Sequence, residues 1–265
     1  MFSSIFLKTM WERRKSIFFW STGIFAYCLM LGLLYPSIEG IEGFEALMDD
    51  MPDALKALIG EVDDITSPTG FLGAEMFNLM LPLILSILAI GVGASVISKE
   101  EESGTIELVL STATSRGRVI LEKAFALVVN VSIVMLAGWL GIALSTVLVD
   151  FDVSLIDVMR ASTATTLLAI TFGLLALMIT ALSGKRGVAI GIATTVFVAS
   201  YFADTLAVLV DDLEFIRNFS LLYYYDSQSI IEGGELFGSV FVLSVVSIMM
   251  LAGAFLGFMR RDIAS

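Results

Sequence analysis

Residues 161–182 have the sequence ASTATTLLAITFGLLALMITAL, a run of 22 residues without a charge. A helix of about 20 such residues crosses the roughly 30 Å hydrocarbon core of a bilayer. The five residues SGKRG separate this run from a second apolar run at 188–210, in which Asp204 is the one charge. The two runs predict a pair of antiparallel membrane-spanning helices joined by a short basic turn.

Four more runs of the same kind occur along the chain, so six spans are predicted: 17–35, 76–97, 124–149, 161–182, 188–210 and 236–259. They are rich in Gly, Ala, Ser and Thr, which let membrane helices approach closely. Hydrophobic residues make up 57% of the 265 residues and charged residues only 16%, against about 25% charge in soluble domains. We predict an all-α polytopic membrane protein, with a single transmembrane domain over 1–265.

Basic residues favour one side of the membrane. Twelve of the 15 Lys and Arg residues fall at the two ends of the chain, in the 98–123 connection and in the 183–187 turn. Basic connections stay on the cytoplasmic side of a membrane. We therefore predict a multi-pass protein of the cell membrane with cytoplasmic N- and C-termini.

Three segments outside the spans have a distinct composition. Residues 1–16 combine helically spaced apolar residues with a basic cluster, which indicates an interfacial elbow helix or a plain basic flank. Residues 36–75 form the largest external loop, and their acidic surface either attracts cations or is simply solvated. Residues 211–235 include three consecutive tyrosines, typical of the membrane interface. We predict an external re-entrant or interfacial segment there.

Residues 98–123, SKEEESGTIELVLSTATSRGRVILEK, form the largest cytoplasmic loop. Ile106, Val109 and Leu110 follow helical spacing and predict a short helix with one apolar stripe. Ser115 is expected to cap a second helix that leads into the third span. A hairpin between two spans needs only a few residues, so this charged helix indicates a docking surface for a partner. An interfacial helix without a partner is the alternative.

The residue types exclude several kinds of chemistry. The chain has no histidine, and its one cysteine, Cys28, allows neither an internal disulfide nor a cysteine zinc cluster. The net charge of −12 has the wrong sign for binding nucleic acid. The turn SGKR at 183–186 lacks the residues of a phosphate-binding Walker A loop. We expect a membrane pathway with no cofactor and no metal of its own.

A secondary carrier is also disfavoured by the sequence. Carriers driven by protons or sodium generally use ionisable groups or broken helices near the middle of the membrane. Within the predicted spans, Asp204 is the one ionisable acid or base, and Pro82 is the one hint of a broken helix. If transport uses energy, a partner must supply it.

The 98–123 loop resembles a motif of the ABC-2-type ABC transporter permease family, E-x-G-T-x-E-x-L-L-S-x-P-x-S-R followed by a Lys. The matching residues include Glu102, Gly104, Thr105, Glu107, Ser111, Ser115, Arg116 and Lys123. The segment FSLLYYYD at 219–226 also looks like the last external loop of that family. The sequence departs from the motif at Ala113-Thr114, where a proline is common.

The resemblance implies two partners within the membrane assembly: a separate ATPase subunit, which would bind ATP and Mg²⁺, and a second permease copy. It also implies that the helix after Gly104 is a coupling helix that sits in a cleft of the ATPase. The implied coupling residues are Glu101, Glu102, Gly104, Thr105, Glu107 and Leu108. The alternative role of the glutamates is electrostatic support of the helix end.

The resemblance further places the contact between two copies on the second and fifth spans. The substrate-path candidates there are Phe77, Asn78, Met80, Leu81, Thr194, Phe197 and Tyr201. Flexible Met and aromatic side chains suit hydrophobic or amphipathic cargo, such as a drug, an antibiotic or a lipid-like compound. The alternative is that these residues only pack the interface between copies.

Two functions from other classes stay open at this point. One is a channel-like or scaffold membrane protein, and the other is a membrane subunit for enzyme maturation, neither with ATP-driven export. Co-purification with an ATPase separates the exporter from the channel or scaffold.

Overall fold

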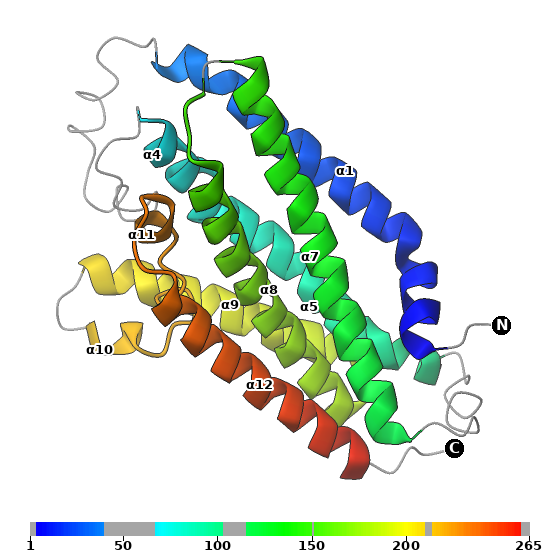
Figure 1. Cartoon of the computed structure of the whole chain (residues 1–265). Coiled ribbons are helices and arrows are strands. Elements are labelled where there is room, and N and C mark those ends of the chain that lie inside the picture. The colour runs from blue at the N-terminus through cyan, green and yellow to red at the C-terminus, as the bar shows by residue number, and fades with distance from the viewer. Residues whose placement is uncertain (1–3, 40–66, 103–114, 150, 210–213, 261–265) are drawn as a thin grey trace.

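The computed structural model describes residues 4–39, 67–102, 115–149, 151–209 and 214–260. Within these ranges six helical segments are long and apolar enough to cross a membrane: Ile5–Ser37, Pro68–Ser98, Arg116–Leu148, Leu155–Ser183, Arg186–Ala207 and Phe237–Arg260. They lie side by side in one bundle (Figure 1). The prediction of an all-α polytopic membrane protein with six spans is confirmed.

The helices of this bundle are α1 Ile5–Glu39, α4 Pro68–Leu72, the π-helix η1 Gly73–Phe77, α5 Met80–Glu102, α7 Arg116–Leu148, α8 Leu155–Ser183, α9 Arg186–Leu209, α10 Glu214–Arg217, α11 Ser227–Ile231 and α12 Phe237–Arg260. Helices α4, η1 and α5 follow one another and form the second span together.

The two ends of the bundle differ in charge. Helices α1, α7 and α9 begin, and α5, α8 and α12 end, at one end of the bundle (Figure 1). We call it the basic end, because it holds Arg116, Arg118, Lys123, Lys185, Arg186 and Arg260. The short helices α4, α10 and α11 lie toward the opposite end (Figure 1). That the basic end faces the cytoplasm stays a prediction.

Helix α8 forms the centre of the bundle. It contacts α5, α7, α9 and α12, whereas α1 packs chiefly along α7. Of the most apolar window of α8, 78% is buried inside the chain, against 17% for α1 and 22% for each of α9 and α12. The outer helices therefore leave broad apolar faces for lipid or for another protein.

Small residues explain how α5 and α8 come so close. A Cβ atom added to Gly93 would overlap the Gly173 carbonyl oxygen, so the two backbones touch there. On another face of α8 the Thr171 hydroxyl shares a hydrogen bond of 2.8 Å with Ser247 on α12. Close approach and hydroxyl pairs of this kind hold membrane helices together where the hydrophobic effect between helices is absent.

The helices extend beyond the charge-free runs from which the spans were predicted. Helix α7 begins at Arg116, as the predicted Ser115 cap requires, although its charge-free run begins only at 124. Helix α8 begins at Leu155 instead of 161, since a scan for charge-free runs passes over the charged residues of its first turns. The second span begins at Pro68, inside the predicted external loop 36–75. Ser67 caps α4 there by accepting a hydrogen bond from the Gly70 N–H. Helix η1 then passes through Glu75, whose side chain is exposed.

The described part of the predicted elbow helix continues into the first span. Helix α1 runs from Ile5 to Glu39 as one element that includes Pro36 in its last turns, and it bends near its N-terminal end (Figure 1). A straight helix of 35 residues would measure about 52 Å, well above the thickness of a hydrocarbon core. The first turn of α1 lies beside α7, where the Phe6 N–H meets Glu122 almost two turns after α7 begins.

Candidate functional site

The predicted coupling loop leaves the bundle at the basic end, between α5 and α7. Glu101 and Glu102 form the last residues of α5. Gly104, Thr105, Glu107 and Leu108 lie outside the described residues, so their role in coupling stays a prediction. What the structure does describe is the base of the loop, where α5 ends and α7 begins.

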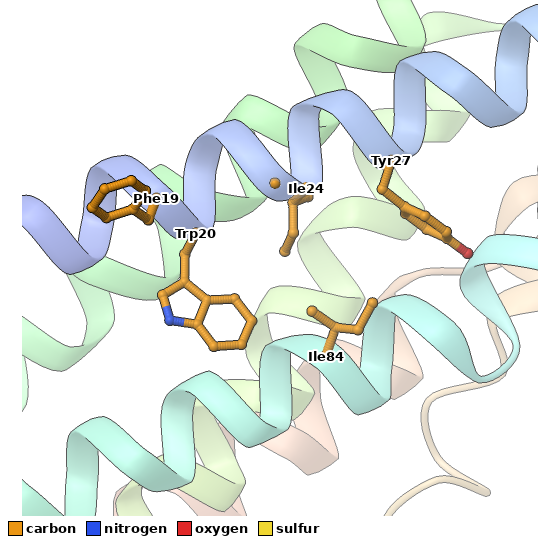
Figure 2. Close-up of a pocket in the computed structure, with 6 residues that line it drawn as sticks. Phe19, Trp20, Ile24, Tyr27 and Ile84 are labelled. Carbon is orange, nitrogen blue, oxygen red and sulfur yellow. The ribbon is translucent and has the colours of Figure 1, made fainter.

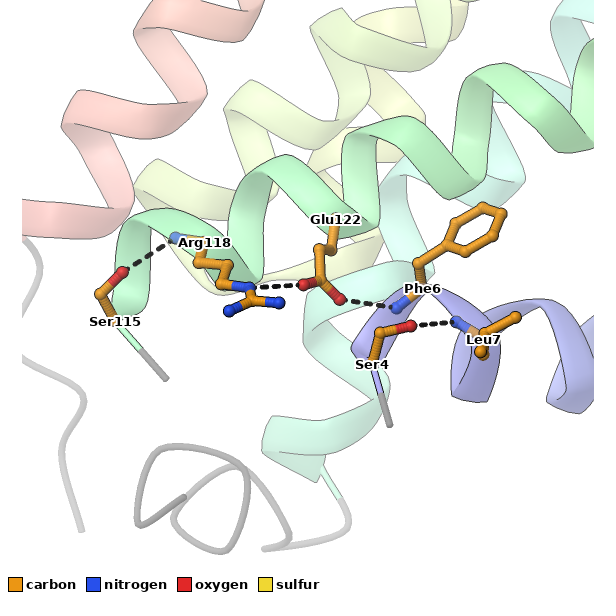
Figure 3. A network of polar contacts seen from close by, with 6 residues as sticks. All are labelled: Ser4, Phe6, Leu7, Ser115, Arg118 and Glu122. Atoms are coloured by element: carbon orange, nitrogen blue, oxygen red, sulfur yellow. Dashed lines mark hydrogen bonds and ion pairs between the residues drawn. The ribbon is translucent and has the colours of Figure 1, made fainter. Parts of the chain in front are cut away.

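Helix α7 begins with the predicted cap. The Ser115 hydroxyl accepts a hydrogen bond of 3.3 Å from the Arg118 N–H, as an N-cap serine does. Figure 3 shows this cap beside the start of α1. The prediction that Ser115 starts a helix leading into the third span is confirmed.

One turn further on, Glu122 joins α7 to the start of α1. One of its carboxylate oxygens accepts from the Phe6 N–H at 3.0 Å, and the other pairs with the Arg118 guanidinium at 2.7 Å (Figure 3). The first N–H groups of a helix have no partner within it, so a carboxylate placed there satisfies them. The first turn of α1 is thus held by the helix that follows the 98–123 loop.

Two basic side chains hold α5 in the same region. Lys123, only 2% exposed, donates a hydrogen bond from its ammonium group to the Val96 carbonyl of α5. Arg13 of α1 donates to the Ser95 hydroxyl, one position earlier on α5. Together with Glu122, these contacts join α1, α5 and α7 around the base of the loop, so a displacement of the loop would reach all three helices.

At the opposite end, the second span is interrupted near Pro82. The Asn78 N–H bonds to the Gly73 carbonyl at 2.8 Å, five residues back, which is the wide spacing of a π-helix. Proline has no N–H to donate, so carbonyl groups in the preceding turn lose their usual partner. The break that Pro82 hinted at in the sequence lies directly before it, at 73–79.

Tyr225 fills the gap that this break leaves. Its hydroxyl donates to the Phe77 carbonyl at 2.9 Å and shares a hydrogen bond of 2.6 Å with Thr165 on α8. Burial raises the pKa of Tyr225 well above its usual value, so the phenol stays protonated and can donate. Asp226 follows with φ 31° and ψ 62°, a left-handed conformation that caps α11 and turns the chain back. The 218–231 segment is therefore docked against the broken helix.

A second contact ties the described part of the 211–235 segment to α9. Asp204 pairs with Arg217 at 2.9 Å, and the Arg217 guanidinium also lies 4.7 Å from the centre of the Tyr223 ring. The one acid in the predicted spans is thus paired with an Arg on α10. The Ser220 hydroxyl adds a hydrogen bond of 2.7 Å to the Ser200 carbonyl of α9.

The seven substrate-path candidates fall into two groups. Phe77, Leu81 and Phe197 are buried within the core of the chain, and the Phe197 ring packs against Phe172 at 5.1 Å. The others have accessible surface: Asn78, Met80, Thr194 and Tyr201. Their role in a transport path stays a prediction.

Two features of the site were not anticipated from the sequence. Lys123 was noticed as part of a motif, but its burial against α5 was not. Asn130 of α7 is fully buried, and both polar atoms of its side chain lack a hydrogen-bond partner among the described residues. A polar residue in the middle of an apolar run was the signal for it, since such residues in membrane spans often have a functional reason.

The chain was also compared with known proteins. A family model described as "ABC-2 family transporter protein" matches residues 3–263. No curated protein matches the chain. Within the described residues, no group of three or more His, Cys, Asp or Glu side chains could hold a metal ion.

Proposed function

The chain belongs to the ABC-2 transporter family, and from this membership we propose that it is the permease subunit of an ATP-driven exporter. Members of this family are membrane subunits of ABC transporters. In our proposal a separate ATPase subunit binds ATP and Mg²⁺ and docks on the 98–123 loop. The exported cargo is a hydrophobic or amphipathic molecule, such as a drug, an antibiotic or a lipid-like compound.

The observation that carries the proposal is the family match over residues 3–263, nearly the whole chain. The base of the loop supports it, because Glu122 and Lys123 connect the loop to α1 and α5. A force applied by an ATPase to the 98–123 loop would therefore be transmitted to the first three spans together. An unanchored loop would dissipate that motion.

A second permease copy completes the proposed assembly. Gly187 and Gly191 on α9 face open space, and Thr194, Thr195 and Val198 near them are exposed. Small residues four apart allow two membrane helices to pack closely. We assign the contact between copies to this face of α9.

Co-purification tests the proposal. The tagged chain is extracted in mild detergent, and the proteins that accompany it are identified by mass spectrometry. We expect an ATPase subunit with a Walker A loop, and ATP hydrolysis by the complex but not by the chain alone. A chain that hydrolyses ATP by itself, or that has no ATPase partner under conditions where it transports, would contradict the proposal and favour the channel or scaffold alternative.

A further inference from the structure

Helices α1 and α5 run side by side but separate over their middle turns. Figure 2 shows Trp20, Ile24 and Tyr27 of α1 facing Ile84 of α5 across this gap. The gap is a groove of 320 Å³, lined by Phe19, Trp20, Gly23, Ile24, Tyr27 and Ile84. Apart from the Tyr27 hydroxyl and the Trp20 N–H, the side chains that line it are apolar.

At each end of the groove, a polar contact joins α1 to the second span. At the end of the groove away from the basic end, the Tyr27 hydroxyl donates to the Glu75 carbonyl at 3.2 Å. At the basic end Arg13 donates to the Ser95 hydroxyl. Between these contacts a Cβ atom added to Gly23 would meet nothing within 4 Å, and neither would one added to Gly91, one turn before Ser95 on the same face of α5. The gap therefore continues toward the basic end.

The groove is open to the membrane. Phe18 and Phe19 beside it are 65% and 70% exposed, and Ile87 on α5 is 55% exposed. Since this surface belongs to two membrane-spanning helices, hydrocarbon is the medium that it meets. An empty apolar groove in that position would be filled by an acyl chain or by another protein.

Positive charge collects where the groove meets the basic end. Arg13 lies there, and Arg186 is the first residue of α9, a helix that packs against α5. The charges of Arg186 and of the neighbouring Glu12 both act on the Arg13 guanidinium, and Glu12 also pairs with Lys8 at 3.8 Å. A guanidinium carries five N–H donors, and the contact with Ser95 uses one of them. Two guanidinium groups near one another favour a bound anion, and Arg suits phosphate through paired hydrogen bonds.

The depth of the groove matches one leaflet of a bilayer. Ser95 and Ile84 are 11 residues apart on α5, which corresponds to about 16 Å of helix. Half of a 30 Å hydrocarbon core is about 15 Å. A lipid whose headgroup lies beside Arg13 would therefore place the end of one acyl chain near Ile84 and Trp20.

We propose that the groove between α1 and α5 binds an anionic phospholipid of the leaflet at the basic end, with its phosphate at Arg13 and Arg186. One acyl chain fills the space between Trp20, Gly23 and Ile84. Charge complementarity decides for this occupant: a helix of a second copy would fill the apolar part but bring no anion, and the single carboxylate of Glu12 does not balance Lys8, Arg13 and Arg186 together. The inference requires membrane insertion alone and does not depend on ATP-driven export.

The test uses the full chain in nanodiscs that contain phosphatidylcholine and phosphatidylglycerol, one of which carries a photoreactive group near the end of an acyl chain. Labelled peptides are identified by mass spectrometry. We expect phosphatidylglycerol to label the peptides around Trp20 and Ile84 more strongly than phosphatidylcholine does. Basic residues near an anionic headgroup contribute about 1 kcal/mol each, so Arg13→Gln and Arg186→Gln should each lower this preference about fivefold.

Three further variants separate the possible occupants. Gly23→Leu combined with Gly91→Leu fills the groove without changing its charge and should abolish labelling there. Gly238→Leu, at the start of α12, also faces open space and should leave the labelling unchanged. Equal labelling by the two lipids, or labelling that survives the filled groove, would overturn the proposal. So would efficient crosslinking of two copies through Gly23→Cys in a Cys28→Ala background, because the groove would then hold protein.

Discussion

The Tyr225 hydroxyl donates a hydrogen bond of 2.9 Å to the Phe77 carbonyl, although 148 positions separate the two residues. The contact joins the segment before α12 to the turn where Pro82 interrupts the second span. Thr165 on α8 shares the same hydroxyl at 2.6 Å. One phenol therefore holds together three segments at the end opposite the basic end.

Replacing Tyr225 by Phe should destabilise this end of the bundle. The variant keeps the ring but leaves the buried Phe77 carbonyl without its donor, a loss of about 1–3 kcal/mol. The measurement is thermal unfolding of the purified protein in a fixed detergent. Tyr224→Phe is the matched control, because the Tyr224 hydroxyl bonds to the Asn218 carbonyl at an exposed position. Equal decreases of the unfolding temperature in the two variants would show that the buried hydrogen bond contributes no more stability than the exposed one.

Lys123→Met should uncouple the permease while leaving it folded. Methionine replaces the buried ammonium with an apolar side chain of similar length. The variant is relieved of the cost of burying a charge, so it stays folded, but it loses the hydrogen bond to the Val96 carbonyl. Hydrogen bonds of charged groups contribute about 1.5–3 kcal/mol, so we expect at least a tenfold loss of transport per ATP hydrolysed. Lys185→Met, at an exposed position of the same end, is the control. A Lys123→Met protein with unchanged coupling would remove this residue from the transmission path.

Glu107→Lys should prevent docking of the ATPase without preventing membrane insertion. Reversing one charge in the first turn of the predicted coupling helix costs roughly 0.3–1 kcal/mol, too little to unfold six spans. A misplaced charge at a docking surface can cost several kcal/mol. The measurement is the amount of ATPase that co-purifies with the permease. Glu232→Lys, an exposed residue directly after α11, should retain the ATPase. Full ATPase binding by Glu107→Lys would exclude this residue from the coupling surface.

Gly191→Leu should separate two permease copies. The added side chain meets nothing within 4 Å in a single copy, and leucine favours helix over glycine by nearly 1 kcal/mol, so the fold is retained. Close approach of a second α9 would be blocked. Native mass spectrometry of the ATPase-bound complex should then give one permease where the parent chain gives two. Two permeases in the variant would place the contact elsewhere.

The sequence was sufficient for the six spans, because each of them contains a long charge-free core. It was less informative at helix ends, where charged residues such as Glu75 and Arg160 lie inside helices that project past the apolar runs. A scan for uncharged runs stops at such residues, although a helix tolerates them wherever the side chain reaches solvent or a partner. Arg160, for example, pairs with Asp157 at 2.8 Å.

The contacts that organise the candidate site could not be read from the sequence. Glu122 and Phe6 are 116 positions apart, and Tyr225 and Phe77 are 148 apart. Local spacing predicts which residues share one helix face, but pairing between distant segments depends on how the helices pack. Pro82 was visible as a helix breaker and Lys123 as part of a motif, yet the π-helical turn before Pro82 and the contact of Lys123 with Val96 became apparent only in three dimensions.

In our proposal this permease moves its cargo only when a separate ATPase drives it. The most direct measurement is uptake of a lipophilic fluorescent dye into inverted membrane vesicles that contain the chain, its co-purifying ATPase, or both. We predict accumulation that requires both proteins and ATP, and that is lost when the Walker A lysine of the ATPase is replaced. Accumulation that proceeds without the ATPase or without ATP would contradict the account.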